Sequence, residues 1–307
     1  FRCDMAEMVP CEFWGWVIPQ IKQKHAKLTF IAEVYNPNEY RNYIHNGHFD
    51  YLYDKVGLYD TLRALTCGYA SATAITGCWQ SVNDIQSHML NFLENHDEQR
   101  IASEFFAGDA RKALPALLVS ACMNTNPMMI YFGQELGEPG MDSEGFSGRD
   151  GRTTIFDYWS VDSIRRWSNH GRYNLHLLND QEKELRHFYQ TVLTLCNKEK
   201  AISKGEFFDL MYVNSDGWMM NPHRQYVFMR KCDDELLLVI TNFDSIPVNI
   251  SVNIPQHAFD FWGMRQYPEI KSRDLLTGKS EKIAFCADKP VVTDVPAYGG
   301  KILKIKL

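Results

Sequence analysis

The sequence predicts an α/β fold of the (β/α)8 TIM-barrel type, followed by an all-β antiparallel sandwich domain. Up to about residue 199, short apolar runs alternate with segments of helical period, and this order favours parallel strands covered by helices. From about residue 200, apolar and polar residues alternate with period two between turn residues, as in antiparallel strands. We therefore expect two domains, at residues 1–199 and 200–307.

The first domain contains five strand-and-helix repeats, where eight close a barrel. The predicted strands are residues 1–4, 28–33, 48–52, 89–93 and 127–132, and the predicted helices are 13–22, 37–46, 54–66, 79–87 and 110–123. A chain of 307 residues is too short for a complete barrel and an accessory domain. Because five strands leave two open edges, we expect the chain to require the upstream half of the barrel for a stable, active protein.

A long polar segment then leads into the second domain. Residues 145–152 within it are rich in glycine but lack the Gly-Lys-Ser/Thr ending of a P-loop, so we interpret them as a wall or lid of the cleft. Residues 180–196 have strong helical periodicity and are expected to close the first domain. The clearest strands beyond them are residues 226–230, 236–240, 248–252 and 301–305.

Three of the apolar runs end in ionisable residues. The chain opens on Phe1-Arg2-Cys3-Asp4, residues 28–33 end in Glu33, and residues 89–93 lead into Asn95-His96-Asp97. In a barrel of parallel strands, groups at the carboxyl ends converge on one pocket. Asp97 also has a structural interpretation, in which it caps the next helix and Glu98 adds charge to the first turn.

The three carboxylates predict glycoside hydrolysis. A pair of carboxyl groups that flanks an acetal oxygen can supply a nucleophile and a proton donor. Arg2 and Asp4 lie on the same side of a strand, so Arg2 can keep Asp4 ionised. The leaving oxygen needs a proton, for which Glu33 is the candidate. Aromatic residues, 13% of the chain, supply platforms for sugar rings, although each one singly is expected in the core.

These motifs resemble those of the α-amylase superfamily, glycoside hydrolase family thirteen. Phe1-Arg2-Cys3-Asp4 resembles the family's fourth-strand motif, Glu33 its fifth-strand acid, and Asn95-His96-Asp97 its seventh-strand motif. The resemblance implies that strands four to eight of the barrel and the C-terminal β domain are present. It also implies that Asp4 is the nucleophile, that Glu33 is the acid/base, and that Asp97, His96 and Arg2 complete the catalytic and substrate-binding set.

The sequence departs from the family pattern after the nucleophile. Many members carry Lys-His three and four residues after it, where this chain has Glu7 and Met8. In the family that His commonly supports a structural calcium ion through its backbone carbonyl. We therefore assign no metal ligand and no cofactor, and a structural calcium ion stays an open alternative.

Composition restricts the partners. A net charge of −6 and a pI near 5.9 give no basic field for nucleic acid or anionic lipid. No apolar stretch approaches the roughly 20 residues that span a bilayer, so we expect a soluble protein, either cytoplasmic or periplasmic/secreted. The eight cysteines show no paired spacing, and we interpret them as mostly reduced packing residues rather than a disulfide framework.

The predicted function is retaining hydrolysis of α-glucosidic bonds in starch-like glucans or maltooligosaccharides. A transglycosylase or sucrose-type enzyme with the same carboxylates is an alternative, because water and sugar acceptors compete for one intermediate. A barrel kept as a binding scaffold is a second alternative, and such a protein is expected to lose at least one of the three acids. Linkage preference and exo or endo action are left open.

Overall fold

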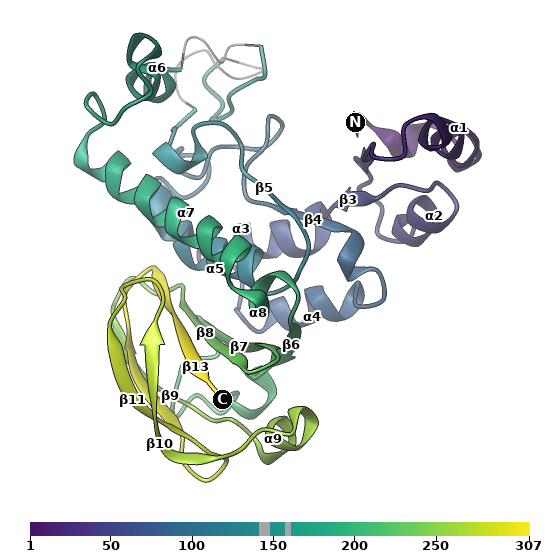
Figure 1. Ribbon diagram of the computed structural model, residues 1–307. Coiled ribbons are helices and arrows are strands. Elements are labelled where there is room, and N and C mark those ends of the chain that lie inside the picture. Colours follow the sequence, from purple (N-terminus) through teal and green to yellow (C-terminus); the bar gives the residue numbers. More distant parts are fainter. Residues whose placement is uncertain (141–147, 157–160) are drawn as a thin grey trace.

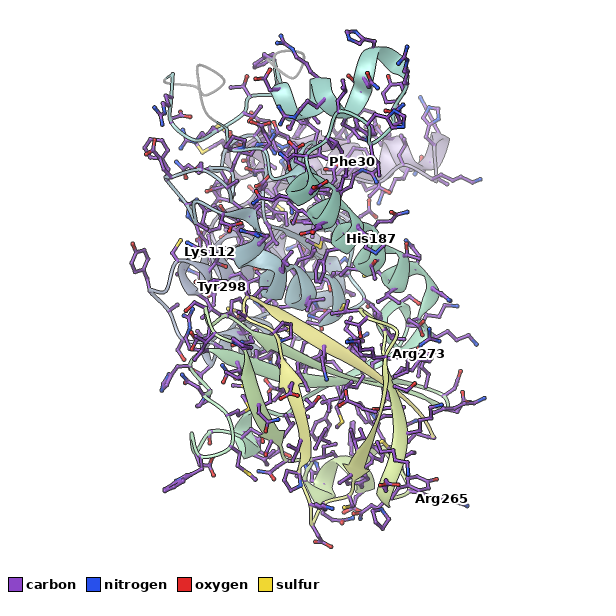
Figure 2. All side chains as sticks on the ribbon, turned by 90° about the vertical axis from the view of Figure 1, so that its left-hand side faces the viewer. Phe30, Lys112, His187, Arg265, Arg273 and Tyr298 are labelled. Carbon is purple, nitrogen blue, oxygen red and sulfur yellow. The ribbon has the colours of Figure 1, made fainter. Side chains whose placement is uncertain are left out.

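The computed structural model describes residues 1–140, 148–156 and 161–307, and it has two parts (Figure 1). In the first part short strands alternate with helices, and in the second most residues lie in antiparallel strands. Figure 2 shows the two parts stacked along the long direction of the molecule, with Phe30 in the first part and Arg265 at the far end of the second.

The first part is built on a parallel sheet whose five strands are neighbours in chain order. They are β1 (Arg2–Cys3), β2 (Ile31–Ala32), β3 (Tyr51–Tyr53), β4 (Met89–Phe92) and β5 (Met128–Met129). The predicted alternation of parallel strands with helices is therefore confirmed. Strand β2 is shorter than predicted because the Phe30 N–H donates to the Asp50 carboxylate (2.8 Å), which also binds Lys22 (2.6 Å), and not to a neighbouring strand.

Helices and single helical turns alternate with these strands and follow them along the chain. They are α1 (Cys11–Lys24), α2 (Tyr40–His45), η2 (Lys55–Tyr59), α3 (Asp60–Thr66), α4 (Ala74–Ser81), α5 (Leu114–Cys122), α6 (Asp162–Ser168), α7 (Asp180–Lys198) and α8 (Lys200–Ser203), with single turns η1 (Ala6–Met8), η3 (Gln86–His88), η4 (Ala110–Ala113), η5 (Gln134–Leu136) and η7 (Asn169–Gly171). Helix α7 begins in a capping box formed by Asn179 and Glu182. Helix α2 starts three residues later than predicted because Asn36 first holds a turn, accepting from the N–H groups of Asn38 and Glu39.

The second part contains a six-stranded antiparallel sheet in the order β11-β10-β13-β8-β7-β6 and a separate pair, β12 and β9. The strands are β6 (Glu206–Asp209), β7 (Gln225–Cys232), β8 (Glu235–Asn242), β9 (Val248–Val252), β10 (Tyr267–Asp274), β11 (Ser280–Phe285), β12 (Val291–Val295) and β13 (Gly299–Lys306), with η8 (Met211–Val213) and α9 (Gln256–Trp262) between them. The four strands predicted in this region are observed as β7, β8, β9 and β13.

One continuous apolar core joins the two parts. Helices α5, α7 and α8 lie against β7, β8 and β13, and their buried side chains form a single cluster (Figure 1). Gly300 on β13 allows the closest approach, because a Cβ there would lie 2.5 Å from the Leu118 side chain of α5. Buried Arg230 on β7 adds a polar connection by donating to four backbone carbonyls, those of Met123, Ala201, Ile202 and Gly205.

The eight cysteines are all free, as expected for packing residues. None of the helices in the described part of the chain combines the length and apolar character needed to traverse a bilayer.

Candidate active site

The predicted site residues meet at the carboxyl ends of three strands. Asp4 follows β1 directly, Glu33 follows β2 directly, and Asp97 lies five residues beyond the end of β4. Because these strands are parallel, their carboxyl ends all lie at the same end of the sheet.

Arg2 holds the three carboxylates together. Its Nη1 hydrogen-bonds Asp4 Oδ1, and its Nη2 lies 3.0 Å from Glu33 Oε2 and 3.6 Å from Asp97 Oδ2. Burial acts to lower the pKa of Arg2, but the negative charges of Glu33 and Asp4 outweigh it, so this pKa is raised above its ordinary value. The guanidinium of Arg2, which is always charged, therefore contacts three carboxylates that come from the ends of three different strands.

The acids differ in exposure. The side chain of Asp4 is 72% exposed and that of Asp97 36%, whereas that of Glu33 is 7% exposed. Asp4 is thus open to a reactant from solvent, and Glu33 is fixed by its neighbours.

Both oxygens of Glu33 have hydrogen-bond donors. Oε1 accepts from the Tyr35 hydroxyl (2.8 Å), and Oε2 accepts from the Met5 backbone N–H (2.7 Å). Met5 has a left-handed backbone, with φ of 41°, and this turn directs its N–H toward Glu33 immediately after Asp4. Burial, and then the hydrogen bond to Glu33, raise the pKa of Tyr35 well above its ordinary value, so Tyr35 stays a donor at neutral pH.

His96 and Asp97 are positioned by Asn95. The side-chain oxygen of Asn95 accepts from the backbone N–H groups of Asp97 and Glu98, both at 2.9 Å, and His96 Nε2 lies 3.1 Å from Asp97 Oδ2. The helix-capping interpretation of Asp97 is wrong, because the next helical turn, η4, is capped by Asp109. Glu98 does not supply first-turn charge either; it pairs with Lys55 and Arg63.

Two further features of the site were not predicted. Tyr35 was expected in the core, yet its hydroxyl contacts the Glu33 carboxylate. Glu94 and Arg100 form a fully buried pair (2.8 Å), and Glu94 also accepts from the Ile101 N–H (2.7 Å). The position of Tyr35 two residues after Glu33 was a usable signal, since alternate residues of an extended segment face the same side.

Glu7 has a structural task beside the site. One of its oxygens accepts from the backbone N–H groups of Tyr35 and Asn36, both at 3.1 Å, and so anchors the segment that follows Glu33. Within residues 1–140, 148–156 and 161–307, no cluster of three or more His, Cys, Asp or Glu side chains is arranged to hold a metal ion.

The segment interpreted as a lid is described only from residue 148, since residues 145–147 lie outside the described residues. Gly151, with φ of +80°, packs against Ser103, and its carbonyl accepts from the Arg100 N–H (2.6 Å). This part of the segment is therefore attached to the residues that follow the Asn-His-Asp motif.

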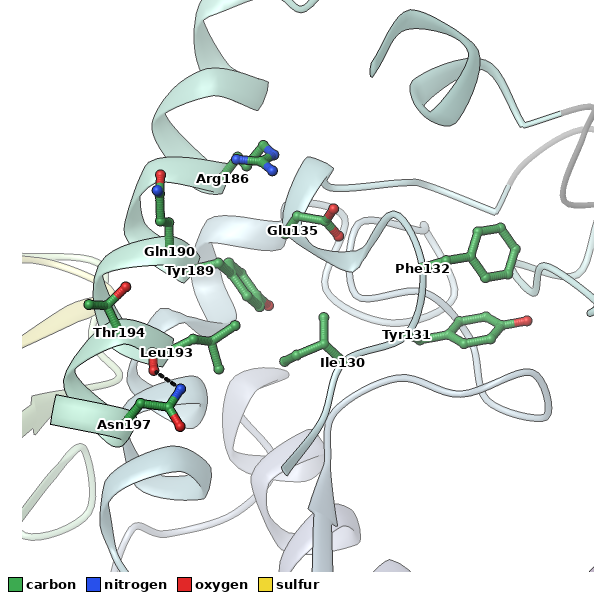
Figure 3. A pocket seen from close by; sticks show the side chains of 10 residues that line it. All are labelled: Ile130, Tyr131, Phe132, Glu135, Arg186, Tyr189, Gln190, Leu193, Thr194 and Asn197. Carbon is green, nitrogen blue, oxygen red and sulfur yellow. Dashed lines mark hydrogen bonds between the residues drawn. The ribbon is translucent and has the colours of Figure 1, made fainter. Parts of the chain in front are cut away.

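A separate cavity of about 490 Å³ lies between α7 and the residues after β5. Figure 3 shows Arg186, Tyr189 and Leu193 of α7 on one side of it and Ile130 on the other. None of the five predicted site residues lines this cavity, so it is not the candidate active site.

Comparison with known proteins identifies a family. Residues 11–205 match the family model described as alpha amylase, catalytic domain. The matched range includes Glu33, His96 and Asp97 but begins after Arg2 and Asp4.

Two curated proteins share part of the sequence. Alpha-amylase MalA of Haloarcula japonica is 30% identical over 146 residues, which make up 46% of this chain and 20% of the relative. A cyclomaltodextrinase of a Bacillus species is 23% identical over 252 residues, 80% of this chain and 38% of the relative. The aligned regions thus span less than half the length of both proteins.

Solved structures establish the fold. The maltogenic alpha-amylase AmyB of Thermotoga neapolitana matches with a TM-score of 0.67 at 18% identity, over 100% of this chain and 61% of that one. AmyP in complex with maltose matches with a TM-score of 0.70 at 16% identity, over 99% and 63%. Since the family model covers well over half of the sequence, the chain belongs to the α-amylase family.

Proposed function

We propose that this chain carries the catalytic residues of a retaining glycoside hydrolase that cleaves α-glucosidic bonds of starch-like glucans or maltooligosaccharides. The observation that carries the proposal is the contact of the Arg2 guanidinium with the carboxylates of Asp4, Glu33 and Asp97. Three acids from three strand ends around one cation match the needs of a positively charged, oxocarbenium-like transition state.

Asp4 is assigned as the nucleophile. Its side chain is exposed, so an anomeric carbon can reach it, and the Arg2 guanidinium hydrogen-bonds one of its oxygens. Glu33 is assigned as the acid/base, because its two hydrogen bonds fix its orientation toward a leaving oxygen.

Asp97 and His96 are assigned to substrate binding. Their side chains lie 3.1 Å apart and are partly exposed, which suits a pair that grips neighbouring ring hydroxyls. Such bonds stabilise the transition state when they strengthen as the ring flattens.

A retaining outcome is favoured by the spacing of the acids. Retaining enzymes hold their two carboxyl groups about 5–5.5 Å apart, whereas inverting enzymes need about 6.5–9.5 Å. Asp4 and Glu33 contact two nitrogens of the same guanidinium, which supports the shorter separation.

The relatives support the substrate class. Their descriptions name an alpha-amylase, a maltogenic alpha-amylase, a cyclomaltodextrinase and a complex with maltose, all of which concern α-glucans. We extend the same proposal to the architecture: residues 1–199 form strands four to eight of a (β/α)8 barrel, and residues 200–307 form a β-sandwich domain.

The test is turnover of maltoheptaose by the full protein with Asp4→Asn or Glu33→Gln. Each change keeps the shape of the side chain, and each is expected to lower kcat by at least about 10³-fold with the fold intact. Glu12→Gln, an exposed acid on α1, is the matched control and is expected to leave kcat unchanged. Near-wild-type turnover by either active-site variant would sink the assignment.

Product analysis separates the remaining alternatives. NMR of the first product should show the α-anomer if the configuration is retained, whereas the β-anomer would indicate inversion. Longer oligosaccharides among the products would favour a transglycosylase, and the absence of any turnover in the wild-type protein would favour a binding scaffold.

A further inference from the structure

A second cavity, of about 760 Å³, lies where the two parts of the molecule meet. Ligand pockets in proteins are usually about 300–1,000 Å³, so this cavity is large enough for an oligosaccharide segment. Its walls come from α4 and from the segments before β4 and β5 on one side, and from β6, η8 and α9 on the other.

The cavity is remote from the catalytic carboxylates. Ser87 and Asn124 line it and precede β4 and β5, so it lies toward the amino ends of these strands. Asp4, Glu33 and Asp97 follow the carboxyl ends of strands in the same parallel sheet. The two sites are therefore at opposite ends of the strands, and they share no residue.

Aromatic rings form one wall, with a buried ring at the centre and exposed rings around it. Phe208 is the centre of the group, with ring centroids of Tyr212, His257 and Phe261 at 6.4, 5.7 and 6.0 Å. Tyr212 is 56% exposed and Phe261 is 60% exposed, although burial of such rings would be favourable. A grouped set of exposed aromatic side chains marks a binding surface rather than a random surface feature.

Asp209 fixes the base of the cavity by accepting three side-chain hydrogen bonds. Its Oδ2 accepts from Thr76 Oγ1 (2.6 Å) and Trp79 Nε1 (2.8 Å) of α4 and from the Tyr226 hydroxyl (3.0 Å) of β7. The Trp79 ring packs edge-on against Phe207 of β6, with centroids 5.2 Å apart. Both parts of the molecule thus build the cavity, and its shape is fixed before a ligand binds.

The rim carries amides instead of cations. Gln80, Asn83 and Asn124 line it beside the carboxylate of Glu206, and none of the described lining residues is Lys or Arg. This combination disfavours an anionic ligand. Aromatic faces with neutral amide donors and acceptors suit a neutral ligand that has both apolar faces and many hydroxyl groups.

We propose that this cavity is a second carbohydrate site that binds a neutral α-glucan segment away from the bond that is cleaved. Tyr212 and Phe261 stack on sugar faces, and the amides of Gln80, Asn83 and Asn124 bond the hydroxyl groups. The choice of α-glucan over other sugars rests on the proposed function, whereas the choice of a neutral carbohydrate rests on the cavity itself.

The test is calorimetric titration of maltoheptaose into the full protein carrying Glu33→Gln, which removes turnover without emptying the second site. Two binding sites are expected. In the same background Tyr212→Ala with Phe261→Ala should weaken one of the two sites at least about tenfold and leave the other in place. Tyr69→Ala, an aromatic residue that is 88% exposed and lies outside the cavity, is the matched control and should change neither site.

A second variant tests the rim independently. Gln80→Ala with Asn83→Ala should weaken the same site as the aromatic double variant. Equal maltoheptaose affinities in the parent and in both double variants would overturn the second site while the proposed function stands. Conversely, binding that depends on Tyr212 and Phe261 would persist even if Glu33 proved dispensable for turnover. If the aromatic double variant changes only the sedimentation behaviour, the wall is a protein interface and the proposal fails.

Discussion

The contact of one guanidinium with three carboxylates predicts that Arg2→Lys is not a conservative change. Arg presents a planar fork that bonds two acceptors at fixed positions, whereas the Lys ammonium is a single point of charge. In this site Nη1 of Arg2 contacts Asp4, and Nη2 contacts Glu33 and Asp97. A Lys at position 2 keeps the positive charge, but its single nitrogen cannot occupy the two positions from which Nη1 and Nη2 of Arg2 contact the carboxylates.

The magnitude follows from the bonds that are lost. The Nη1 contact with Asp4 is a hydrogen bond, and a hydrogen bond to a charged group contributes about 1.5–3 kcal/mol. The Nη2 contacts with Glu33 and Asp97 are ion-pair contacts without hydrogen-bond geometry. With loss of about 1.5–3 kcal/mol of transition-state stabilisation, and tenfold for each 1.36 kcal/mol, kcat/KM should fall by about 10–10²-fold. The side chain of Arg2 is 25% exposed and lies at the first residue of β1, so the fold should tolerate the change.

The assay is kcat/KM on maltoheptaose, together with the thermal midpoint of each variant. Arg41→Lys is the matched control, because Arg41 also bonds a carboxylate through two nitrogens but does so on the surface, with Asp84. It should stay within about twofold of the wild type, since exposed ion pairs contribute little. If Arg2→Lys kept a third or more of the wild-type kcat/KM, Arg2 would not organise the site.

Two stability predictions concern buried charges. Burial raises the pKa of Asp54 to about 6, so the folded state holds a proton that the unfolded state releases, and stability falls as the pH rises from about 4 to 6. Asp54→Asn should remove this loss, about 3 kcal/mol, which urea unfolding at pH 4.5 and pH 7 would reveal as a flatter pH dependence. Arg230→Met should lower the free energy of unfolding by about 3–5 kcal/mol, because it leaves four buried carbonyls without their donor. Arg273→Met, on exposed β10 positions, should change it by less than about 0.5 kcal/mol, and an equal effect of both would contradict the connecting role of Arg230.

The grouping of the five site residues was predictable from the sequence. An apolar run that ends in an acid is unusual, because a buried strand seldom ends in charged residues. Three such runs in one chain, on parallel strands, have one common consequence, which is a cluster at their carboxyl ends. The observed contacts of Arg2 with Asp4, Glu33 and Asp97 follow that logic.

The partners of each acid were not predictable, because they depend on long-range packing. Residues 94–100 contain three acidic side chains that look equivalent in the sequence. Glu94 binds Arg100 in the interior, Asp97 faces the site, and Glu98 turns toward Lys55 and Arg63. Local sequence does not decide among these directions, since each partner is set by a different segment of the fold.

The strands of the second part of the molecule also differ in how well the sequence predicts them. Strands β7, β8 and β13 lie in the middle of the sheet and carry the apolar residues that made them visible in the sequence. Strands β10 and β11 lie toward one edge, where exposed Lys and Glu residues dilute the alternation. Periodicity therefore found these three strands and β9 of the separate pair, and it missed β6, β10, β11 and β12.

Burial alone does not separate the proposed acid/base from the structural carboxylates in this fold. Glu33, Asp54 and Glu94 are 6%, 5% and 1% exposed, so exposure would place all three in one class. Their partners differ, because Asp54 binds the first turn of a helix and Glu94 binds a fully buried Arg. Glu33 instead shares Arg2 with Asp4 and Asp97, whose side chains are 72% and 36% exposed, so among the three buried acids it is the one whose partner also contacts acids open to solvent.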